Sequence, residues 1–224
     1  MKTLIILAYA PDKYIDLLQT EMKTAGSFDH VLLSYAGCRA RNAYPACSPS
    51  AIAKRAKGDV TVLPLFMTDG AVYSAAKAEI DASVRAAHRA PLLENKKSID
   101  GFASALRTVC IDNAATGCIW VGHGSHAREN SGYAELQAQL GAHTKIALLH
   151  GKPDIREALQ TLETPSVSLF PLMFTAGHHV RKDICAADSP VMQALQATGK
   201  PFALSKRGLL AYGEFRAYLR MRNA

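Results

Sequence analysis

Short apolar runs alternate with amphipathic stretches along the whole chain. This alternation limits the possible folds of the chain more than any other feature of the sequence. The runs are rich in Val, Ile and Leu without polar alternation, which is typical of strands covered on both faces. They fall at residues 3–8, 30–34, 60–64, 117–121, 145–149, 167–171 and 201–204. Helical patterns lie between them at 13–25, 72–88, 100–109, 130–140, 154–162, 192–198 and 212–222. Such alternation predicts an α/β fold with parallel sheets and helices on both faces.

The two halves of the sequence also resemble each other. Residues 62–70 and 169–177 both read as an apolar strand, Pro-Leu, two large apolar residues, Thr, one further residue and Gly. Residues 5–10 and residues 119–124 form a second pair of similar segments. We therefore expect two tandem copies of one α/β unit, residues 1–113 and 114–224. The alternative is two unrelated strand–turn–helix units.

Composition places the chain among ordinary globular proteins. It has 224 residues, of which 49% are hydrophobic and 20% charged, so disorder and fibrous structures are excluded. No apolar run approaches the ~18–20 residues that a membrane span requires. The apolar start of the chain ends at Pro11-Asp12-Lys13 without a small-residue cleavage site, and it is interpreted as a first strand rather than a signal peptide. These features predict a cytoplasmic protein that does not bind membranes.

The cysteines do not indicate a metal finger. The chain has five of them, scattered and without a CxxC pair. An odd, scattered number in a chain without a secretion signal favours reduced, mostly buried thiols.

The net charge is positive but evenly spread. Lys and Arg number 26 against 19 Asp and Glu, which gives +7. Both halves carry a similar excess, and no basic arm or stripe with interleaved aromatic residues is present. Nucleic-acid binding is therefore not expected. A diffuse positive field is compatible with a small polyanionic ligand, and equally with a basic protein whose charge has no such role.

Histidines follow three consecutive predicted strands of the second half. His123 lies between two glycines after the strand 117–121, and His150 directly follows 145–149. His178 and His179 lie on the turn after 167–171. Because the carboxyl ends of parallel strands form the ligand-binding edge of such sheets, we expect these imidazoles to lie together. Converging imidazoles suit divalent cobalt, iron, nickel or zinc rather than magnesium or calcium.

Other kinds of site have weaker support. The Gly122-His123-Gly124 turn lacks the third glycine of a dinucleotide-binding loop, and no P-loop lysine is present. Ser125 lies near His123 but outside any GxSxG elbow, so it is a weak candidate for a nucleophile. His30, His88 and His143 have no comparable placement, and His126 is intermediate.

Around the histidines the sequence resembles class II chelatases of the sirohydrochlorin cobaltochelatase and ferrochelatase type. The resemblance rests on Val-Gly-His-Gly-Ser at 121–125 and on Phe-Pro-Leu-Met-Phe-Thr-Ala-Gly-His-His-Val-Arg-Lys-Asp-Ile at 170–184. It implies two three-layer α/β units with a cleft between them, and metal ligation by His123 and His179. The chain departs from the family at Tyr9 and Val72, which replace the corresponding histidines of the first half, and at His150, where the family has a glutamate.

The resemblance also implies the reaction. A divalent metal substrate, cobalt first and iron or nickel as alternatives, is inserted into a tetrapyrrole polycarboxylate such as sirohydrochlorin without an organic cofactor. His123 and His179 are the expected ligands, with His150 as third ligand or base. The candidates for binding the tetrapyrrole carboxylates are Ser125, Arg128, Arg181 and Lys182.

Several alternatives stay open at this point. Asp183 either orients an imidazole from behind or caps a helix. The lost first-half histidines favour a non-catalytic carrier of metal or tetrapyrrole on the same fold, and a zinc-dependent hydrolase would use the same imidazoles. The sequence leaves open whether the protein forms a homo-oligomer, and whether it acts in the synthesis of cobalamin or of siroheme.

Overall fold

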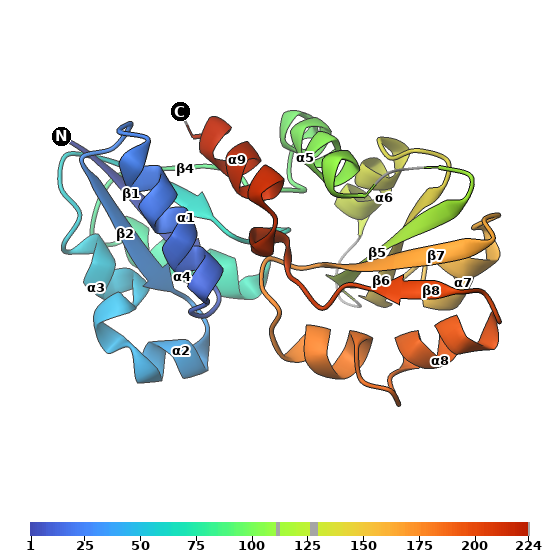
Figure 1. The fold of residues 1–224 in the computed structure, drawn as a ribbon. Helices are drawn as coiled ribbons and strands as arrows, with labels where there is room; N and C mark the ends of the chain where they lie inside the picture. Colours follow the sequence, from blue (N-terminus) through green and yellow to red (C-terminus); the bar gives the residue numbers. More distant parts are fainter. Residues whose placement is uncertain (111–112, 126–129, 224) are drawn as a thin grey trace. The chain divides into compact units, whose positions relative to one another are not determined.

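Two parallel four-stranded sheets form the frame of the protein (Figure 1). The structure is a computed structural model that describes residues 1–110, 113–125 and 130–223. The first sheet contains β1 (Lys2–Ala8), β2 (His30–Tyr35), β3 (Asp59–Pro64) and β4 (Ala86–His88) in the order β2-β1-β3-β4. The second contains β5 (Thr116–Gly124), β6 (Thr144–His150), β7 (Ser166–Leu172) and β8 (Phe202–Leu204) in the order β6-β5-β7-β8. Both sheets therefore have one topology, as a duplicated unit requires.

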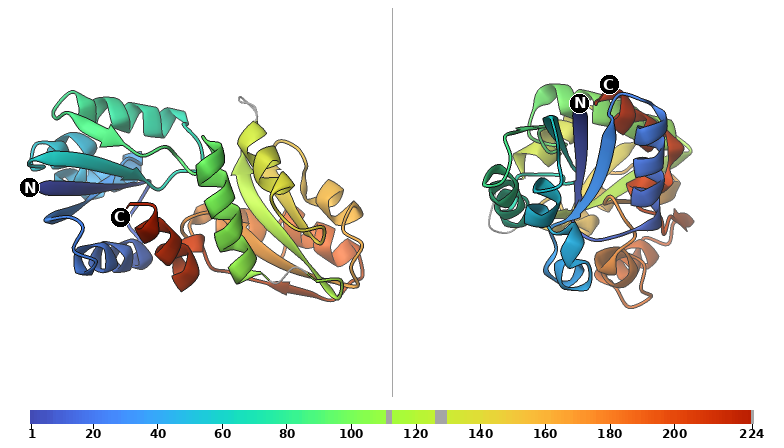
Figure 2. Two further views of the ribbon diagram at one scale, coloured as in Figure 1. Left: turned by 90° about the horizontal axis from the view of Figure 1, so that it is seen from above. Right: turned by 90° about the vertical axis from the view of Figure 1, so that its left-hand side faces the viewer.

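Helices lie on both faces of each sheet, which gives the expected three-layer α/β architecture (Figure 2). In chain order they are α1 (Lys13–Thr24), α2 (Cys38–Ala43), α3 (Pro49–Ala53), α4 (Ala71–Asp81), α5 (Lys96–Val109), α6 (Ser131–Ala138), α7 (Ile155–Gln160), α8 (Pro190–Ala197) and α9 (Gly213–Met221). Their starts follow the local sequence: the side chains of Asp12, Asp154 and Ser189 accept hydrogen bonds from the first turns of α1, α7 and α8. Among the described residues, no helix has the length and apolarity to span a membrane.

The apolar runs of the strands fill the core of each sheet. In β1, every residue after Lys2 is buried, as expected for a strand covered on both faces. One face of the first sheet packs on α3 and α4 through residues such as Ile5, Val62 and Ile80. In the second sheet, Ile119 packs with residues of α7 and α8. The cores therefore lie against the middle of the strands, which leaves the strand ends available for polar side chains.

The prediction of one long helix over 72–88 was wrong. Helix α4 ends at Asp81, and residues Ala86–His88 form β4, which pairs in parallel with β3. The His88 ring is hydrogen-bonded to the Asp81 carboxylate, Nε2 to Oδ1, at 2.7 Å. Alanine-rich sequence favours a helix locally, but the vacant edge of β3 offers these residues backbone hydrogen bonds that outweigh that preference.

The described chain forms two compact units. The first comprises Met1–Ser98 together with Arg216–Ala224, and the second comprises Ile99–Phe215. The last part of α9 thus belongs to the first unit, where Arg216 pairs with Glu21 of α1. This division concerns spatial packing, whereas the boundary at 113–114 concerns the duplicated sequence, and that boundary stays a prediction.

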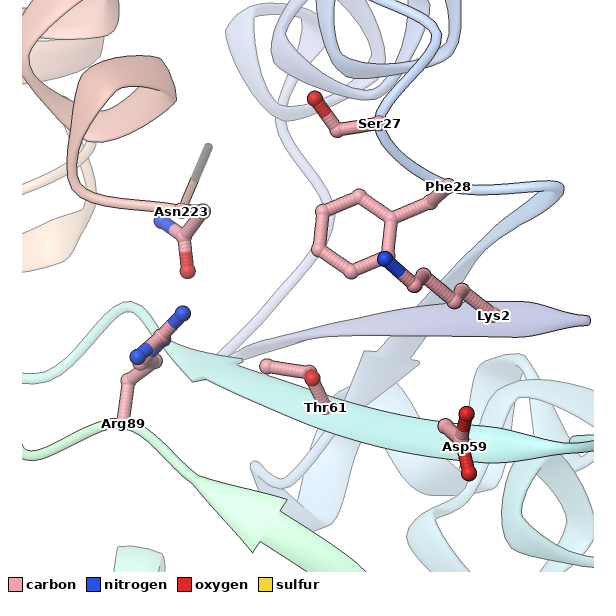
Figure 3. Close-up of a pocket in the computed structure, with 7 residues that line it drawn as sticks. All are labelled: Lys2, Ser27, Phe28, Asp59, Thr61, Arg89 and Asn223. Carbon is pink, nitrogen blue, oxygen red and sulfur yellow. The ribbon is translucent and has the colours of Figure 1, made fainter.

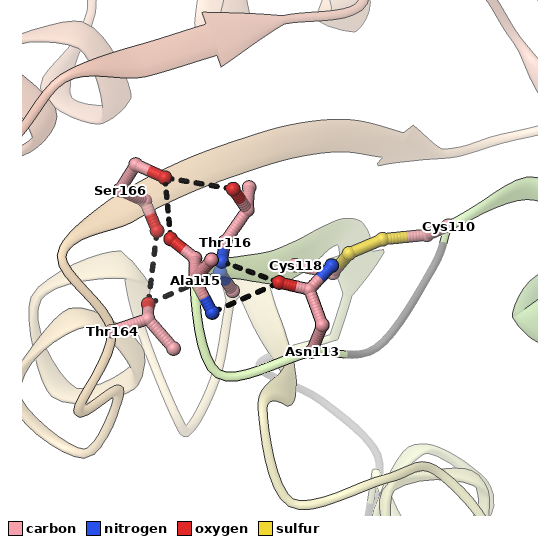
Figure 4. The surroundings of a disulfide bond; sticks show 8 residues. Cys110, Asn113, Ala115, Thr116, Cys118, Thr164 and Ser166 are labelled. Carbon is pink, nitrogen blue, oxygen red and sulfur yellow. Dashed lines mark hydrogen bonds between the residues drawn. A yellow bond between two sulfur atoms is a disulfide. The ribbon is translucent and has the colours of Figure 1, made fainter.

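A disulfide corrects the expectation of reduced thiols. Cys110, just after α5, is bonded to Cys118 of β5, and both residues are buried (Figure 4). The sequence spacing of eight residues gave no sign of this pair, because the chain reverses direction between α5 and β5. Below the disulfide, the side-chain oxygen of Asn113 accepts hydrogen bonds from the backbone N–H groups of Ala115 and Thr116. The other cysteines, Cys38, Cys47 and Cys185, are free thiols.

Candidate metal site

The three candidate ligands lie at the carboxyl edge of the second sheet. His123 is the penultimate residue of β5 and His150 is the last residue of β6, so each belongs to its strand rather than to the following loop. His179 lies beyond the end of β7. In the strand order, β5 lies between β6 and β7, so the chain passes from β5 to β6 on one side and then to β7 on the other. The three residues therefore surround a topological switch point. Open α/β sheets bind their ligands at such a point.

The rings of these residues are close together. The centroid of the His123 ring lies 4.6 Å from that of His179 and 4.8 Å from that of His150. Two imidazoles that bind one tetrahedral metal through nitrogens at ~2.1 Å have centroids roughly 5 Å apart, which is similar to the observed spacing. Within the described residues, no group of three or more His, Cys, Asp or Glu side chains forms a complete metal site. The three-histidine ligand set therefore stays a prediction, and the pair His123–His179 is its best-defined part.

A π-helical turn positions His179. The turn spans Val180–Ile184 and begins directly after His179. It brings the Asp183 carboxylate to the ring, where Oδ2 lies 2.6 Å from Nδ1. Metal-binding histidines commonly donate one ring N–H to a carboxylate, which leaves the other nitrogen with its lone pair. Of the two roles considered for Asp183, the contact fits orientation of the imidazole, and it directs ligation to Nε2.

The tautomer of His123 is set by the backbone. Its Nδ1 lies 3.0 Å from the carbonyl oxygen of Gly124. A carbonyl only accepts hydrogen bonds, so Nδ1 carries the proton and the Nε2 of the neutral ring has the lone pair. Gly124 has a positive φ of 68°, and a Cβ there would overlap the carbonyl oxygen of His150. The glycine that follows His123 is therefore required by the close approach of β5 and β6 at this edge.

The remaining predicted site residues are less closely tied to this group. Ser125 lies on the loop after β5, where its carbonyl accepts a hydrogen bond from Asn130 at 3.1 Å. Arg181 and Lys182 are exposed on the π-helical turn, and the Arg181 guanidinium donates to the carbonyl of Ala176 at 3.2 Å. Arg128 and His126 lie outside the described residues. The two exposed cations are near the histidines in sequence, but their role toward carboxylates stays a prediction.

Two further groups at this edge are unsuited to ligation or proton transfer. Burial raises the pKa of Tyr133, which packs beneath Gly122, to about 12, so its hydroxyl keeps its proton near neutral pH. Burial also raises the pKa of the Cys185 thiol at the end of the π-helical turn, which disfavours the thiolate form that binds metals. The chemistry available at this edge is therefore that of imidazole and carboxylate.

Sequence reasoning missed two features of the site. The π-helical turn was not expected, although such turns often occur at functional sites. The signal was the spacing of four between His179 and Asp183, which brings two side chains to one side of a helical turn. The carbonyl of Gly124 was also missed, because a sequence does not show backbone direction. His178 was expected on the same turn as His179. It is exposed, and the centroid of its ring lies 5.9 Å from that of His179.

Comparison with known proteins identifies the family of the chain. The family described as cobalt chelatase (CbiK) matches residues 45–221, which is most of the chain and includes all three histidines. The chain belongs to the cobalt chelatase (CbiK) family. The family is described as one of cobalt chelatases. No curated protein sequence matches the chain significantly.

Solved structures share the fold of this CbiK-family chain. SirB from Bacillus subtilis, determined with Fe³⁺, has a TM-score of 0.62 at 12% identity, with 99% of this chain and 94% of SirB covered. CbiX, described as the terminal enzyme of siroheme biosynthesis in denitrifying bacteria, gives 0.59 at 15% identity and covers 100% of this chain and 99% of its own. A multi-domain Deinococcus radiodurans protein with structural similarity to chelatases gives 0.67 at 14% identity. That match covers 98% of this chain, which spans about half (54%) of the Deinococcus protein.

Proposed function

We propose that this chelatase inserts Co²⁺ into sirohydrochlorin in the cytoplasm, as a step of the tetrapyrrole biosynthesis that leads to cobalamin. Fe²⁺ and Ni²⁺ are the alternative metals. One observation carries the proposal: His123 and His179 each have Nδ1 engaged by an acceptor, and their rings are 4.6 Å apart. Both Nε2 atoms are thereby prepared to bind a borderline divalent metal, the class to which cobalt belongs.

Three tasks then fall to residues of this chain. The Nε2 atoms of His123 and His179 replace water on the incoming metal, and as neutral imidazoles they release it more readily than thiolates would. The tetrapyrrole must lose two pyrrole N–H protons, and the nearby imidazole of His150 is the proposed acceptor, which takes one proton at a time and passes it to water before taking the next. The 26 basic residues outnumber the 19 acidic ones and attract a polycarboxylate, and Arg181 and Lys182, two and three residues after His179, are the proposed contacts among the described residues.

The test is an absorbance time course with sirohydrochlorin and Co²⁺, each in excess over the protein. We expect many metallated rings per chain, at a rate that exceeds the protein-free reaction with the same metal. Parallel runs with Fe²⁺ and Ni²⁺ under anaerobic conditions rank the metals. The double variant His123→Ala/His179→Ala is the matched control, because it keeps the protein and removes only the ligands.

Two outcomes would contradict the proposal. At most one metallated ring per chain would identify a non-catalytic carrier, the alternative that the lost first-half histidines favour. Zinc-dependent hydrolysis of activated esters without metallation would identify a hydrolase that uses the same imidazoles.

A further inference from the structure

A cavity lies at the edge of the first sheet where β1 and β3 begin. This edge is opposite to the carboxyl ends of the strands, which in the second sheet carry the candidate metal site. It has a volume of about 390 Å³ and lies entirely within the first compact unit. Its walls come from the beginning of β1 and β3 and from the chain after β4 and α9, through Lys2, Asp59, Thr61, Arg89 and Asn223, with the Phe28 ring at one side (Figure 3). Nothing in the metallation reaction uses these residues.

A buried acceptor without a partner lies in the wall of this cavity. Asn223 is only 3% exposed, and its side-chain nitrogen donates to the carbonyl of Leu219 at 2.7 Å. Its oxygen Oδ1 is buried and has no hydrogen-bond partner among the described residues. Leaving such an atom unpaired is costly, so the site is suited to a ligand that brings an N–H or O–H group to it. Figure 3 shows this oxygen on the same side of the cavity as the Arg89 guanidinium.

Two cations, Arg89 and Lys2, line this cavity. Neither Arg89 nor Lys2 forms a side-chain ion pair with any described residue. Arg222, next to Asn223, has a buried Nη1 without a partner, while its other nitrogen donates to the carbonyl of Ala90. Burial lowers the pKa of Arg222, and the guanidinium of Arg89 lowers it further, against an opposing effect of Tyr218. Arg222 lines neither cavity, so Arg89 is the guanidinium in the wall, and a guanidinium without an ion pair among the described residues is suited to binding an anion.

A more apolar cavity lies next to the first. A second cavity of about 220 Å³ shares Ser27, Phe28 and Asn223 with the first and is otherwise lined mainly by Met22, Ala25 and Met221. Its one cation, Arg220, is already paired with Glu21. The combined space therefore offers an anion-binding end, a central acceptor, an aromatic wall and an apolar end.

We propose that this space binds a small α-hydroxy carboxylic acid with an apolar tail. The carboxylate lies against Arg89, the hydroxyl donates to Oδ1 of Asn223, and the tail follows Phe28 toward Met22 and Met221. An α-amino acid is less suitable, because its ammonium would face Arg89, while the one carboxylate of the cavity, Asp59, lies at the other end with Lys2 (Figure 3). The proposal is independent of the metallation reaction.

The test compares four matched probes by nuclear magnetic resonance shift titration of the whole chain. 3-Phenyllactate has the carboxylate, hydroxyl and ring; 3-phenylpropionate lacks the hydroxyl, phenylalanine replaces it with ammonium, and 1-phenylpropan-2-ol keeps the hydroxyl but has a methyl group in place of the carboxylate. A ligand of this size binds with a dissociation constant of roughly 1 mM or below. We expect phenyllactate to bind about three- to tenfold more tightly than phenylpropionate, and the amino acid and the alcohol more weakly than both.

Variants assign the binding to this site. Arg89→Gln removes an exposed side chain and should weaken both acids about tenfold. Arg85→Gln makes the same change at an exposed position outside both cavities and should have no effect. Asn223→Ala should abolish the preference for phenyllactate; circular dichroism shows whether loss of its bond to Leu219 disturbs α9.

Three results would overturn the proposal. They are no binding of either acid at roughly 10 mM, equal binding of phenyllactate and phenylpropionate, and binding that survives Arg89→Gln. The first would leave Arg89 as an internal donor to Asn223, with no ligand between them. Because no outcome depends on metallation, failure here leaves the proposed function untouched, and the reverse also holds.

Discussion

The two sheets have the same strand order but carry different residues where their central strands end. In the second sheet, His123 is the penultimate residue of β5, and His179 follows β7. At the corresponding positions of the first, Tyr9 follows β1 and is 60% exposed, and Val72 at the start of α4 is 40% exposed. The exposed Tyr9 and Val72 offer no imidazole to a metal, although their sheet has the same strand order. The fold therefore forms without histidines at these positions, and only the second unit carries the proposed ligands.

The supporting residue differs as well. The offset that aligns Val72 with His179 aligns Ala76 with Asp183. Ala76 is only 1% exposed and packs in the core on a regular α-helix, whereas Asp183 reaches the His179 ring from a π-helical turn. At these positions the first unit therefore has no counterpart of the proposed ligands, of the carboxylate that orients one of them or of the turn that positions the carboxylate. The comparison teaches that the site is a local set of residues and helical geometry added to a shared frame.

The largest effect should follow removal of a ligand. We expect His123→Ala and His179→Ala each to lower the rate of metallation by more than about 100-fold, because the metal loses one of its two best-placed nitrogen donors. Both side chains lie past the packed part of the sheet, so truncation opens no core cavity, and the circular dichroism and Tm should stay those of the parent. His30→Ala, at the other end of a first-sheet strand, is the control and should keep full activity. Unchanged metallation in either ligand variant would remove that residue from the site.

A smaller loss is expected from Asp183→Asn. The substitution keeps the shape but removes the carboxylate that holds Nδ1 of His179 at 2.6 Å. Loss of such a supporting partner typically costs 10–100-fold in metal affinity or activity, so we expect a drop of about that size, seen chiefly as a higher metal concentration for half-maximal rate. Asp188→Asn removes an exposed acid beyond the same turn and should change little. If Asp183→Asn lowers Tm without changing the metal dependence, the carboxylate only stabilises the turn.

The disulfide gives a third difference between the units. Cys110–Cys118 closes a short loop in the second unit, while the first contains only free cysteines, Cys38 and Cys47. By the loop-entropy relation, a loop of this length contributes about 2.5 kcal/mol to the free energy of unfolding. We expect Cys110→Ser/Cys118→Ser to lower unfolding stability by about that amount, with little effect on metallation.

A count of thiols in the denatured protein checks the pairing itself. With the disulfide present, the reactive thiols are those of Cys38, Cys47 and Cys185. Cys38→Ser/Cys47→Ser is the matched control in the first unit and should leave stability nearly unchanged. Reaction of all five cysteines in freshly prepared, unreduced protein would contradict the disulfide.

Much of the frame could be predicted from the sequence because it depends on apolar patterning. Strands such as β1 and β5 are continuous apolar runs, and their burial follows from composition alone. What failed depends on distant contacts: β4 exists because β3 has a free edge, and Cys110 meets Cys118 because the chain reverses between them. The edge that holds the histidines could be predicted from strand order, but the tautomer of His123 depends on the direction of one carbonyl, which no residue type encodes.

The smallest expected change concerns His150, where the chain departs from the chelatases it resembles. Its ring lies edge-on to His123, with centroids 4.8 Å apart, so a side chain here is close enough to affect a metal held by His123. Glutamate would add a negative charge and a hard oxygen donor in place of a neutral nitrogen. His150→Glu should therefore keep metallation within about tenfold of the parent but shift the ranking of metals from Co²⁺ and Ni²⁺ toward Fe²⁺. His150→Gln, which adds an oxygen donor without charge, separates the two contributions: it should shift the ranking less than Glu does. The same ranking of the three metals in parent and both variants would show that His150 only borders the site, and would leave His123 and His179 as its ligands.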